Sequence, residues 1–431
     1  MMKKDFDSNW EVKTSGFTLP LWFRGAEDTK EFSKLTDDIS TEVVIIGGGI
    51  AGISAAYLLS KAGKKVVVLE DGYLASGESG RTTAHITHAL DDRYYNLENI
   101  HGLRGSKLAA ESHTAAINLI DSTVKEEAID CDFERIDGYL FLDATDDIQS
   151  LERELEAAHN AGLKDVKMER DSPLKHRDIS PCLCFPEQAQ FQPLRYILGL
   201  AKEITSKYGG KIYTETHASE VQSENQKVGV KTSDGHKVTA TSAILATNAP
   251  IVDKVSKIYD KQKAYRTYAI ATDIRKDAIP KALYWDTGNQ KSKEDVKPYH
   301  YIRIQKKDND DKYDSLIVGG EDHTTGSAKN KKEIDHRFER LDNWMRNRFP
   351  VEKSLPYKWS GQIMEPEDGL AFIGVNPGPD KGIYIATGDS GNGMTHGTIA
   401  GILLSDLILG KNNPWEGLYS PSRIIGHKED A

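Results

Sequence analysis

The chain of 431 residues is 38% hydrophobic and 28% charged, with a formal net charge of −10. Its length predicts two or three domains with sizeable cores, and its acidic balance excludes nucleic acid as an expected partner. Cys131, Cys182 and Cys184 form neither a disulfide framework nor a metal-ligand cluster, so we expect no metal site and a reducing, cytoplasmic location. The longest apolar run, 43–59, is interrupted by glycines, so we expect no membrane span.

The first 40 residues show no clear helical or strand period. They hold Trp10, Pro20, Trp22 and Phe23 among many charged residues. We interpret 1–40 as an extended N-terminal arm that lies on the body of the protein.

A dinucleotide-binding pattern follows. The apolar run at 43–46 leads into three spaced glycines, Gly47, Gly49 and Gly52, and a helical pattern begins at once. These glycines permit a tight turn, close approach of a pyrophosphate, and close packing of helix on strand. The free N–H groups at the start of the helix bind phosphates. A second apolar strand ends on Glu70, 18 residues after Gly52, which is close to the spacing of a carboxylate that binds a ribose hydroxyl and disfavours a 2′-phosphate.

The central part of the chain alternates between helical and strand patterns. Apolar spacing and end signals predict helices at 103–129, 146–162, 194–207 and 335–348. Short alternating runs predict strands at 138–142, 211–215, 218–222, 228–232, 237–241, 243–250, 265–272, 299–305 and 315–318. The charged run 306–312 is typical of a solvated hairpin tip.

The last third of the chain repeats the opening arrangement. An apolar strand at 382–388 enters a glycine-rich turn at 389–397, and an apolar helix follows at 398–409. We expect both strand–turn–helix units to belong to one discontinuous nucleotide-binding domain, with β-rich segments inserted between them. The predicted boundaries are 41–125, 190–250 and 355–425 for the nucleotide-binding domain, and 126–189 and 251–354 for the inserted substrate domain.

Three motifs together resemble a known family. The glycine motif with Glu70, the segment 244–250 and the segment 386–397 are similar to the FAD-dependent oxidoreductases of the D-amino-acid-oxidase type, which include glycine oxidase and sarcosine oxidase. The resemblance covers about 40–425. It implies an α/β fold with a Rossmann-like FAD-binding domain of the glutathione-reductase type and an inserted β-rich α+β substrate domain. It also implies FAD as the cofactor.

The resemblance is closer still to a bacterial branch in which the flavin domain precedes a Rieske iron–sulfur domain. The matching segments are 80–87, 91–95, 359–362 and 413–423. Members of that branch continue into a Cys-x-His…Cys-x-x-His segment, which this sequence does not contain. If no iron–sulfur cluster is present, we expect electrons to pass to oxygen or to a separate carrier. Ile317 and Val318 occupy the stretch where sarcosine oxidases often place an oxygen-activating lysine, which favours the separate carrier.

The resemblance implies a set of FAD-binding residues drawn from all three motifs. They are Gly47, Gly49, Ile50, Ala51, Gly52, Glu70, Asp71, Ser79, Gly80, Arg81, Thr82, Thr83, His85, Thr247, Asn248, Gly361, Gly388, Asp389, Gly391, Asn392, Gly393, Met394 and Thr395. The helix that follows the last motif can direct its positive end at the anionic locus of reduced flavin. Some relatives attach FAD covalently through a histidine near the position of His85, but here we expect His85 to pack without a covalent bond.

The resemblance implies hydride transfer from a C–H bond beside nitrogen to flavin N5. Arg303 alternates with Tyr301 along one strand, so the two side chains share a face. Such an arginine can bind a substrate carboxylate through two hydrogen bonds, although a structural arginine fits the same pattern. Tyr265 and His323 are weaker candidates for the same site.

The leading prediction is therefore oxidation of a small amine or amino acid. Three alternatives stay open at this point. They are a 2-hydroxy-acid or polyol dehydrogenase on the same fold, a flavin monooxygenase that uses NAD(P)H, and a flavin electron-transfer subunit with no small substrate.

Overall fold

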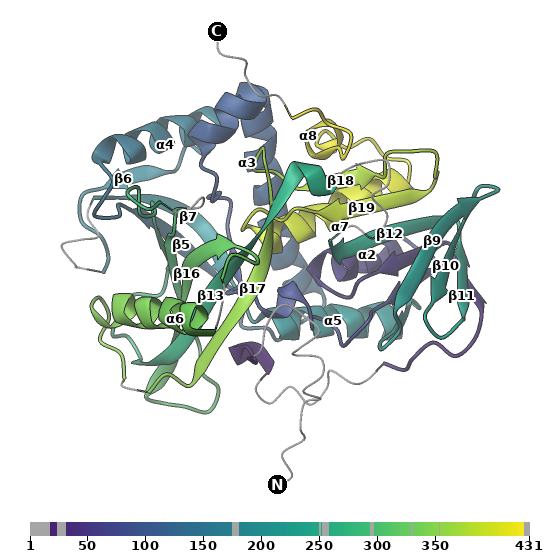
Figure 1. Ribbon diagram of the computed structural model, residues 1–431, viewed down its shortest axis with the longest axis horizontal. Coiled ribbons are helices and arrows are strands. Elements are labelled where there is room, and N and C mark those ends of the chain that lie inside the picture. Colours follow the sequence, from purple (N-terminus) through teal and green to yellow (C-terminus); the bar gives the residue numbers. More distant parts are fainter. Residues whose placement is uncertain are drawn as a thin grey trace.

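The computed structural model describes residues 18–23, 32–174, 181–249, 251, 258–293, 297–328, 331–352 and 354–425. Trp10 and most of the predicted N-terminal arm lie outside these residues. Three sheets organise the described chain (Figure 1). A helix-covered parallel sheet lies between a small four-stranded sheet, at the right of the view, and a large mixed sheet at the left.

The central sheet has six strands in the order β18-β19-β12-β2-β3-β8. All its pairings are parallel except that of β18 with β19. Its strands are β2 (Val43–Ile46), β3 (Val66–Leu69), β8 (Lys211–Tyr213), β12 (Ser242–Asn248), β18 (Phe372–Val375) and β19 (Ile383–Thr387). Every residue of β2 and β3 is buried, as apolar runs in a sheet covered on both faces should be.

Three helices pack against this sheet or against each other. They are α2 (Ile50–Lys61), α5 (Pro193–Ser206) and α7 (Gly393–Ile408), and α2 contacts both of the others. A side chain at Gly397 would lie 2.5 Å from Ile50, and one at Gly401 would lie 2.6 Å from Ser54. Glycine at both positions therefore allows α7 to approach α2 closely, which brings the starts of the two helices together.

The small sheet has the order β1-β11-β10-β9. Its strands are β1 (Ile39–Ser40), β9 (Ala218–Glu224), β10 (Lys227–Thr232) and β11 (Lys237–Ala240). The predicted strands at 218–222, 228–232 and 237–241 are confirmed by this sheet, and the turn at Asp234 and Gly235 joins β10 to β11.

The large sheet runs in the order β17-β13-β16-β15-β14-β5-β7-β4, and β6 also pairs with β7. Its strands are β4 (His85–Ile86), β5 (Glu134–Phe141), β6 (Lys167–Glu169), β7 (Cys182–Gln190), β13 (Gln262–Arg275), β14 (Leu283–Asp286), β15 (His300–Gln305), β16 (Tyr313–Thr324) and β17 (Tyr357–Pro366). The charged run 306–312 connects the antiparallel β15 and β16, as predicted.

The remaining helices lie around these sheets. They are α3 (Tyr94–Glu126), α4 (Ile148–Asn160), α6 (Lys331–Arg346) and α8 (Glu416–Tyr419), with short 3-10 helices η1 (Leu21–Phe23), η3 (Glu78–Gly80) and η5 (Ile258–Lys261). The four helices predicted in the central part of the chain are present. None of the helices among the described residues combines the length and apolar character needed to cross a membrane.

Several boundaries differ from the prediction. The last predicted helix corresponds to α7, which begins at Gly393 rather than at 398, because the glycine-rich turn already adopts helical geometry after Asn392. The sequence did not indicate β7, whose residues are mostly buried and therefore show no polar alternation. β17 pairs along its length with β13 in the large sheet, although the predicted nucleotide-binding segment starts at 355. The division into two domains stays a prediction, and the α/β fold class is confirmed.

Candidate functional site

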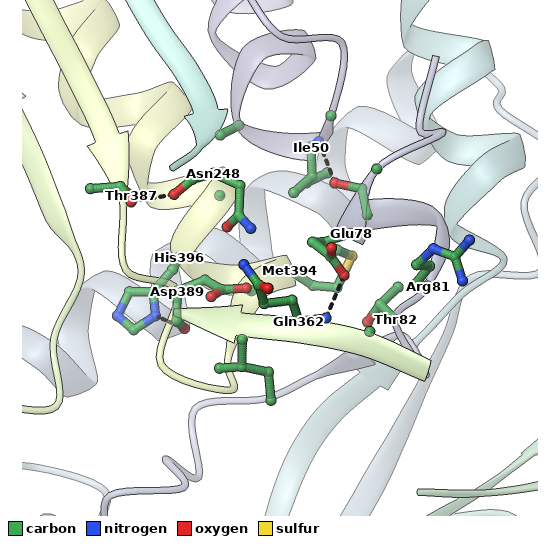
Figure 2. Close-up of a pocket in the computed structure, with 18 of the residues that line it drawn as sticks. Ile50, Glu78, Arg81, Thr82, Asn248, Gln362, Thr387, Asp389, Met394 and His396 are labelled. Atoms are coloured by element: carbon green, nitrogen blue, oxygen red, sulfur yellow. Dashed lines mark hydrogen bonds between the residues drawn. The ribbon is translucent and has the colours of Figure 1, made fainter. Parts of the chain in front are cut away.

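A cavity of about 420 Å³ extends between the N-terminal ends of α2 and α7 (Figure 2). In the view, Thr387, Asp389 and His396 lie on one side, and Glu78 and Thr82 lie on the other. All the predicted cofactor residues line it except Gly52, Gly80 and Thr395. Those that line it are Gly47, Gly49, Ile50, Ala51, Glu70, Asp71, Ser79, Arg81, Thr82, Thr83, His85, Thr247, Asn248, Gly361, Gly388, Asp389, Gly391, Asn392, Gly393 and Met394.

The start of α2 forms one end of this cavity. The Ile50 amide donates a 2.9 Å hydrogen bond to Ser79 Oγ, and Glu70 accepts hydrogen bonds from the amides of Gly48 at 2.6 Å and Gly72 at 2.8 Å. Burial raises the pKa of Glu70 above its ordinary value. A glycine-rich helix start next to a carboxylate is the arrangement that binds a pyrophosphate and a ribose.

The three predicted residues that do not line the cavity support it from behind. A side chain at Gly52 would collide with the carbonyl of Gly47, and one at Gly80 would lie 2.7 Å from the Phe23 ring. Thr395 Oγ1 lies 2.8 Å from His113 Nδ1. Gly52 and Gly80 therefore permit close approach of the neighbouring chain, and Thr395 contacts His113 rather than the cavity.

The loop that carries Arg81 and Thr82 is fixed by two tryptophans. Trp359 Nε1 donates to the Arg81 carbonyl and Trp22 Nε1 donates to the Thr82 carbonyl, each at 2.7 Å. Glu78 accepts a 2.7 Å hydrogen bond from the Gln362 amide, and burial raises the pKa of Glu78 to about 7. The loop therefore holds its shape through contacts with η1 and β17.

The turn before α7 supplies another part of the cavity wall. Gly391 has φ of 70°, where glycine is favoured, and the Asp91 amide donates a 3.1 Å hydrogen bond to Asn392 Oδ1. Asp389 accepts a 3.2 Å hydrogen bond from the Met364 amide, and burial raises the pKa of Asp389 to about 6. The free amides at the start of α7 and the positive end of its dipole lie at the cavity wall.

The wall supplied by the large sheet contains residues that sequence reasoning missed. Thr267, Trp285 and Tyr299 line the cavity beside the predicted Tyr301. Tyr301 Oη lies 2.6 Å from Thr267 Oγ1, and the Tyr299 hydroxyl donates a 2.6 Å hydrogen bond to Asp91 Oδ2. The alternation that singled out Tyr301 and Arg303 also contains Tyr299, two residues earlier, and that signal could have found it.

The position of Arg303 contradicts the prediction that it binds a substrate carboxylate. It is fully buried, is not among the described residues that line the cavity, and donates to the carbonyls of Ala84 at 2.8 Å and Phe191 at 2.9 Å and to the Gln305 side chain. Its guanidinium also lies 5.4 Å from the Trp22 ring centroid. The arginine therefore braces the fold behind the cavity and is not placed to bind a substrate.

Tyr265 and His323 also lie away from the cavity wall. Both are buried and neither is among its lining residues. His323 Nε2 lies 2.9 Å from the hydroxyl of Tyr268, which does line the cavity. His323 is therefore separated from the cavity by Tyr268.

His85 lines the cavity, and both its ring nitrogens have partners. Nδ1 lies 3.0 Å from Thr83 Oγ1 and Nε2 lies 3.3 Å from the Ile302 carbonyl. Burial lowers the pKa of His85 to about 3, so the ring is neutral. The absence of a covalent bond between His85 and the cofactor stays a prediction.

Comparison with known proteins identifies the family. The profile of the FAD-dependent oxidoreductase (DAO) family matches residues 42–407. The chain belongs to this family. This FAD-dependent oxidoreductase is 30% identical over 404 residues to YhfW of Bacillus subtilis (strain 168), a protein named for a Rieske 2Fe-2S iron–sulfur centre, covering 94% of this chain and 75% of that one. It is 25% identical over 393 residues to γ-glutamylputrescine oxidoreductase of Escherichia coli (strain K12), covering 88% and 86%.

Solved structures share the fold of this oxidoreductase. Glycine oxidase from Geobacillus kaustophilus superposes with a TM-score of 0.71 at 17% identity, covering 90% of this chain and 100% of that one. L-Proline dehydrogenase from P. horikoshii superposes with a TM-score of 0.67 at 21% identity, covering 90% and 98%. FAD is the cofactor of the family, and the cavity fits it, because glycines and the N-terminal ends of α2 and α7 line it where bulkier side chains would exclude a dinucleotide.

Proposed function

We propose that this FAD-dependent oxidoreductase oxidises a C–N bond of a small amine or amino acid. One observation carries the proposal. The cavity does not end at the nucleotide motifs but continues to a wall of Thr267, Trp285, Tyr299 and Tyr301 from the large sheet. A pure electron-transfer subunit needs no such extension, whereas an enzyme needs a place for a substrate beside its cofactor.

The chain's own residues bind the cofactor and exclude water. The start of α2 and Glu70 bind the phosphates and a ribose, while the amides at the start of α7 stabilise negative charge that builds beside them on the cofactor. The aromatic wall displaces water from the substrate. FAD, when bound, supplies the two-electron acceptor for the C–H bond next to nitrogen.

The names of the relatives support an amine or amino acid as the substrate, because they include γ-glutamylputrescine oxidoreductase and glycine oxidase. We further propose that electrons leave to oxygen or to a separate carrier. The relative named for a Rieske centre supports the carrier. A cytoplasmic location stays part of this proposal.

The visible spectrum of the purified, FAD-loaded protein tests the reaction class. The protein is mixed anaerobically with amines, N-methyl amino acids, 2-hydroxy acids and NAD(P)H in turn. Bleaching of the flavin band by an amine or amino acid is the expected result. Bleaching by a hydroxy acid or by NAD(P)H alone assigns the dehydrogenase or the monooxygenase instead, and no bleaching by any compound assigns an electron-transfer subunit.

A further inference from the structure

We propose that the substrate end of the cavity selects an amine cation and rejects a carboxylate beside the reacting nitrogen. The inference rests on the proposed function and names its substrate class. We define the acidic aromatic wall as Asp91, Thr267, Trp285, Tyr299 and Tyr301, all of which line the cavity.

The charges around the cavity are the first argument. Among the described lining residues, Arg81 is the one lysine or arginine, whereas Asp91, Glu78 and Asp389 are acids. Arg81 Nη1 donates to the carbonyls of Thr18 at 3.3 Å and Ser360 at 3.1 Å, and Figure 2 shows its guanidinium pointing away from the cavity centre. A buried substrate carboxylate would find no partner of opposite charge there, and such burial is unfavourable.

The position of Asp91 is the second argument. Its Oδ2 accepts the 2.6 Å hydrogen bond from Tyr299, while its Oδ1 takes no hydrogen bond from any residue in the described ranges. A side chain at Gly391 would collide with Asp91 Oδ2, so glycine there leaves the carboxylate room against the turn before α7. One oxygen is thus fixed by Tyr299, and the other is available to an ammonium group.

The aromatic residues complete the site. The ring centroids of Tyr299 and Tyr301 lie 5.3 Å apart, and aromatic faces attract a cation. Trp285 is 4% exposed, and its Nε1 has no hydrogen-bond partner within the described chain. The far edge of its indole lies over Gly138, where a side chain would come within 2.5 Å of the ring. Trp285 therefore contributes its ring, and not a polar group, to the wall of the cavity.

These contacts fit an amine whose reacting carbon carries no carboxylate. Asp91 and the tyrosine rings hold the nitrogen as a cation, and the Trp285 ring adds apolar surface beside them. An α-amino acid would bring its carboxylate next to Asp91, and like charges in a low-dielectric site repel strongly.

A matched pair of compounds tests the inference in the FAD-loaded protein. n-Butylamine and norvaline differ by one α-carboxyl group. We expect n-butylamine to perturb the oxidised flavin spectrum with at least a tenfold lower Kd than norvaline. The variant Asp91→Asn should weaken n-butylamine binding at least tenfold and narrow the difference between the two compounds, and Tyr299→Phe should do so to a smaller degree.

The exposed Asp130→Asn removes the same charge outside the cavity and should leave both Kd values unchanged. Tighter binding of norvaline, or an unchanged ratio in Asp91→Asn with full FAD content, would overturn the inference. If Asp91→Asn does not fold, the ratio in the parent protein and in Tyr299→Phe still decides. If the compounds bind but neither bleaches the flavin anaerobically, the proposed oxidation is wrong. The ratio of the two Kd values still tests the present inference, because it does not depend on turnover.

Discussion

The indole Nε1 of Trp22 donates a 2.7 Å hydrogen bond to the carbonyl oxygen of Thr82. The two residues are 60 positions apart, and Thr82 lines the cofactor cavity. Trp22 itself is 2% exposed and lies over the Arg303 guanidinium. The short helix η1 therefore fastens the loop that borders the cofactor.

Replacing Trp22 by Phe should weaken FAD binding. The variant keeps an aromatic ring near Arg303 but removes the hydrogen bond to Thr82, which contributes about 1 kcal/mol, or about a fivefold increase in the Kd of FAD. Titration of the apoprotein with FAD measures the change. Trp415→Phe is the matched control, because it removes a 3.2 Å hydrogen bond to Glu111 away from the cavity, and an equal loss in that variant would contradict the role of Trp22.

Arg303→Met should destabilise the protein without changing substrate selectivity. The substitution leaves the buried carbonyls of Ala84 and Phe191 without donors, at a cost of about 3 kcal/mol in the free energy of unfolding. Urea unfolding of the variant, compared with Arg303→Lys, measures this cost. A variant that keeps its stability and loses only its response to carboxylated substrates would restore the carboxylate-binding role.

Ser390 joins two buried carboxyl groups. Its Oγ lies 2.6 Å from Asp92 Oδ2 and 2.7 Å from Glu365 Oε1. One hydroxyl has one proton to donate, so the second carboxyl must carry a proton of its own. Burial raises the pKa of Asp92 to about 7 and raises the pKa of Glu365 well above its ordinary value.

These raised pKa values predict that stability falls as the pH rises. The folded state binds a proton that the unfolded state has already released above pH 3.8, so the stabilisation is complete below that pH and is lost as the pH rises through about 7. Between pH 5 and pH 8 we expect Tm to fall by about 3 °C or more from this pair. Asp92→Asn, which stays neutral, should flatten the profile.

Thermal unfolding across this pH range checks the effect, with Asp130→Asn as the control that keeps the parent profile. A parent profile that rises from pH 5 to pH 8, or one that Asp92→Asn leaves unchanged, would show that these carboxyls share no proton.

Gly391→Ala should disturb both the turn before α7 and the position of Asp91. Gly391 has φ of 70°, and an added Cβ would collide with Asp91. Backbone strain alone costs about 1–2 kcal/mol, and displacement of Asp91 should add a loss of amine affinity. FAD content and the n-butylamine Kd check both effects, with Gly410→Ala as the control, because it shares the same φ but has nothing within 4 Å. Equal effects in both variants would leave strain as the sole cause.

The parts of the molecule that the sequence predicted are those built from local patterns. The turns around Gly47 and Gly391 need a backbone conformation or a close approach of neighbouring atoms that residues other than glycine permit poorly. The roles of these glycines in cofactor binding could therefore be assigned from their spacing in the sequence. The helices followed from apolar periodicity and end signals, as at Asp147, whose side chain caps α4 at the Gln149 amide.

The parts that the sequence did not predict depend on which distant residues become neighbours. Asp91 and Tyr299 are 208 positions apart and meet only because β15 lies in the large sheet beside the turn before α7. Arg303 and Tyr301 share a strand as expected, but Ala84 and Phe191 surround the arginine while Tyr301 reaches the cavity. Alternation along a strand shows which side chains share a face. It does not show which of them line the cavity and which are buried in the core.

The stoichiometry of a single anaerobic turnover tests the central claim most directly. Excess n-butylamine is mixed with the FAD-loaded protein, and the amount of reduced flavin is compared with the amounts of aldehyde and ammonia recovered after quenching. Oxidation of the C–N bond predicts one aldehyde and one ammonia for each flavin that takes up two electrons. Flavin reduction with no aldehyde, or a flavin that no amine or amino acid reduces, would contradict the account.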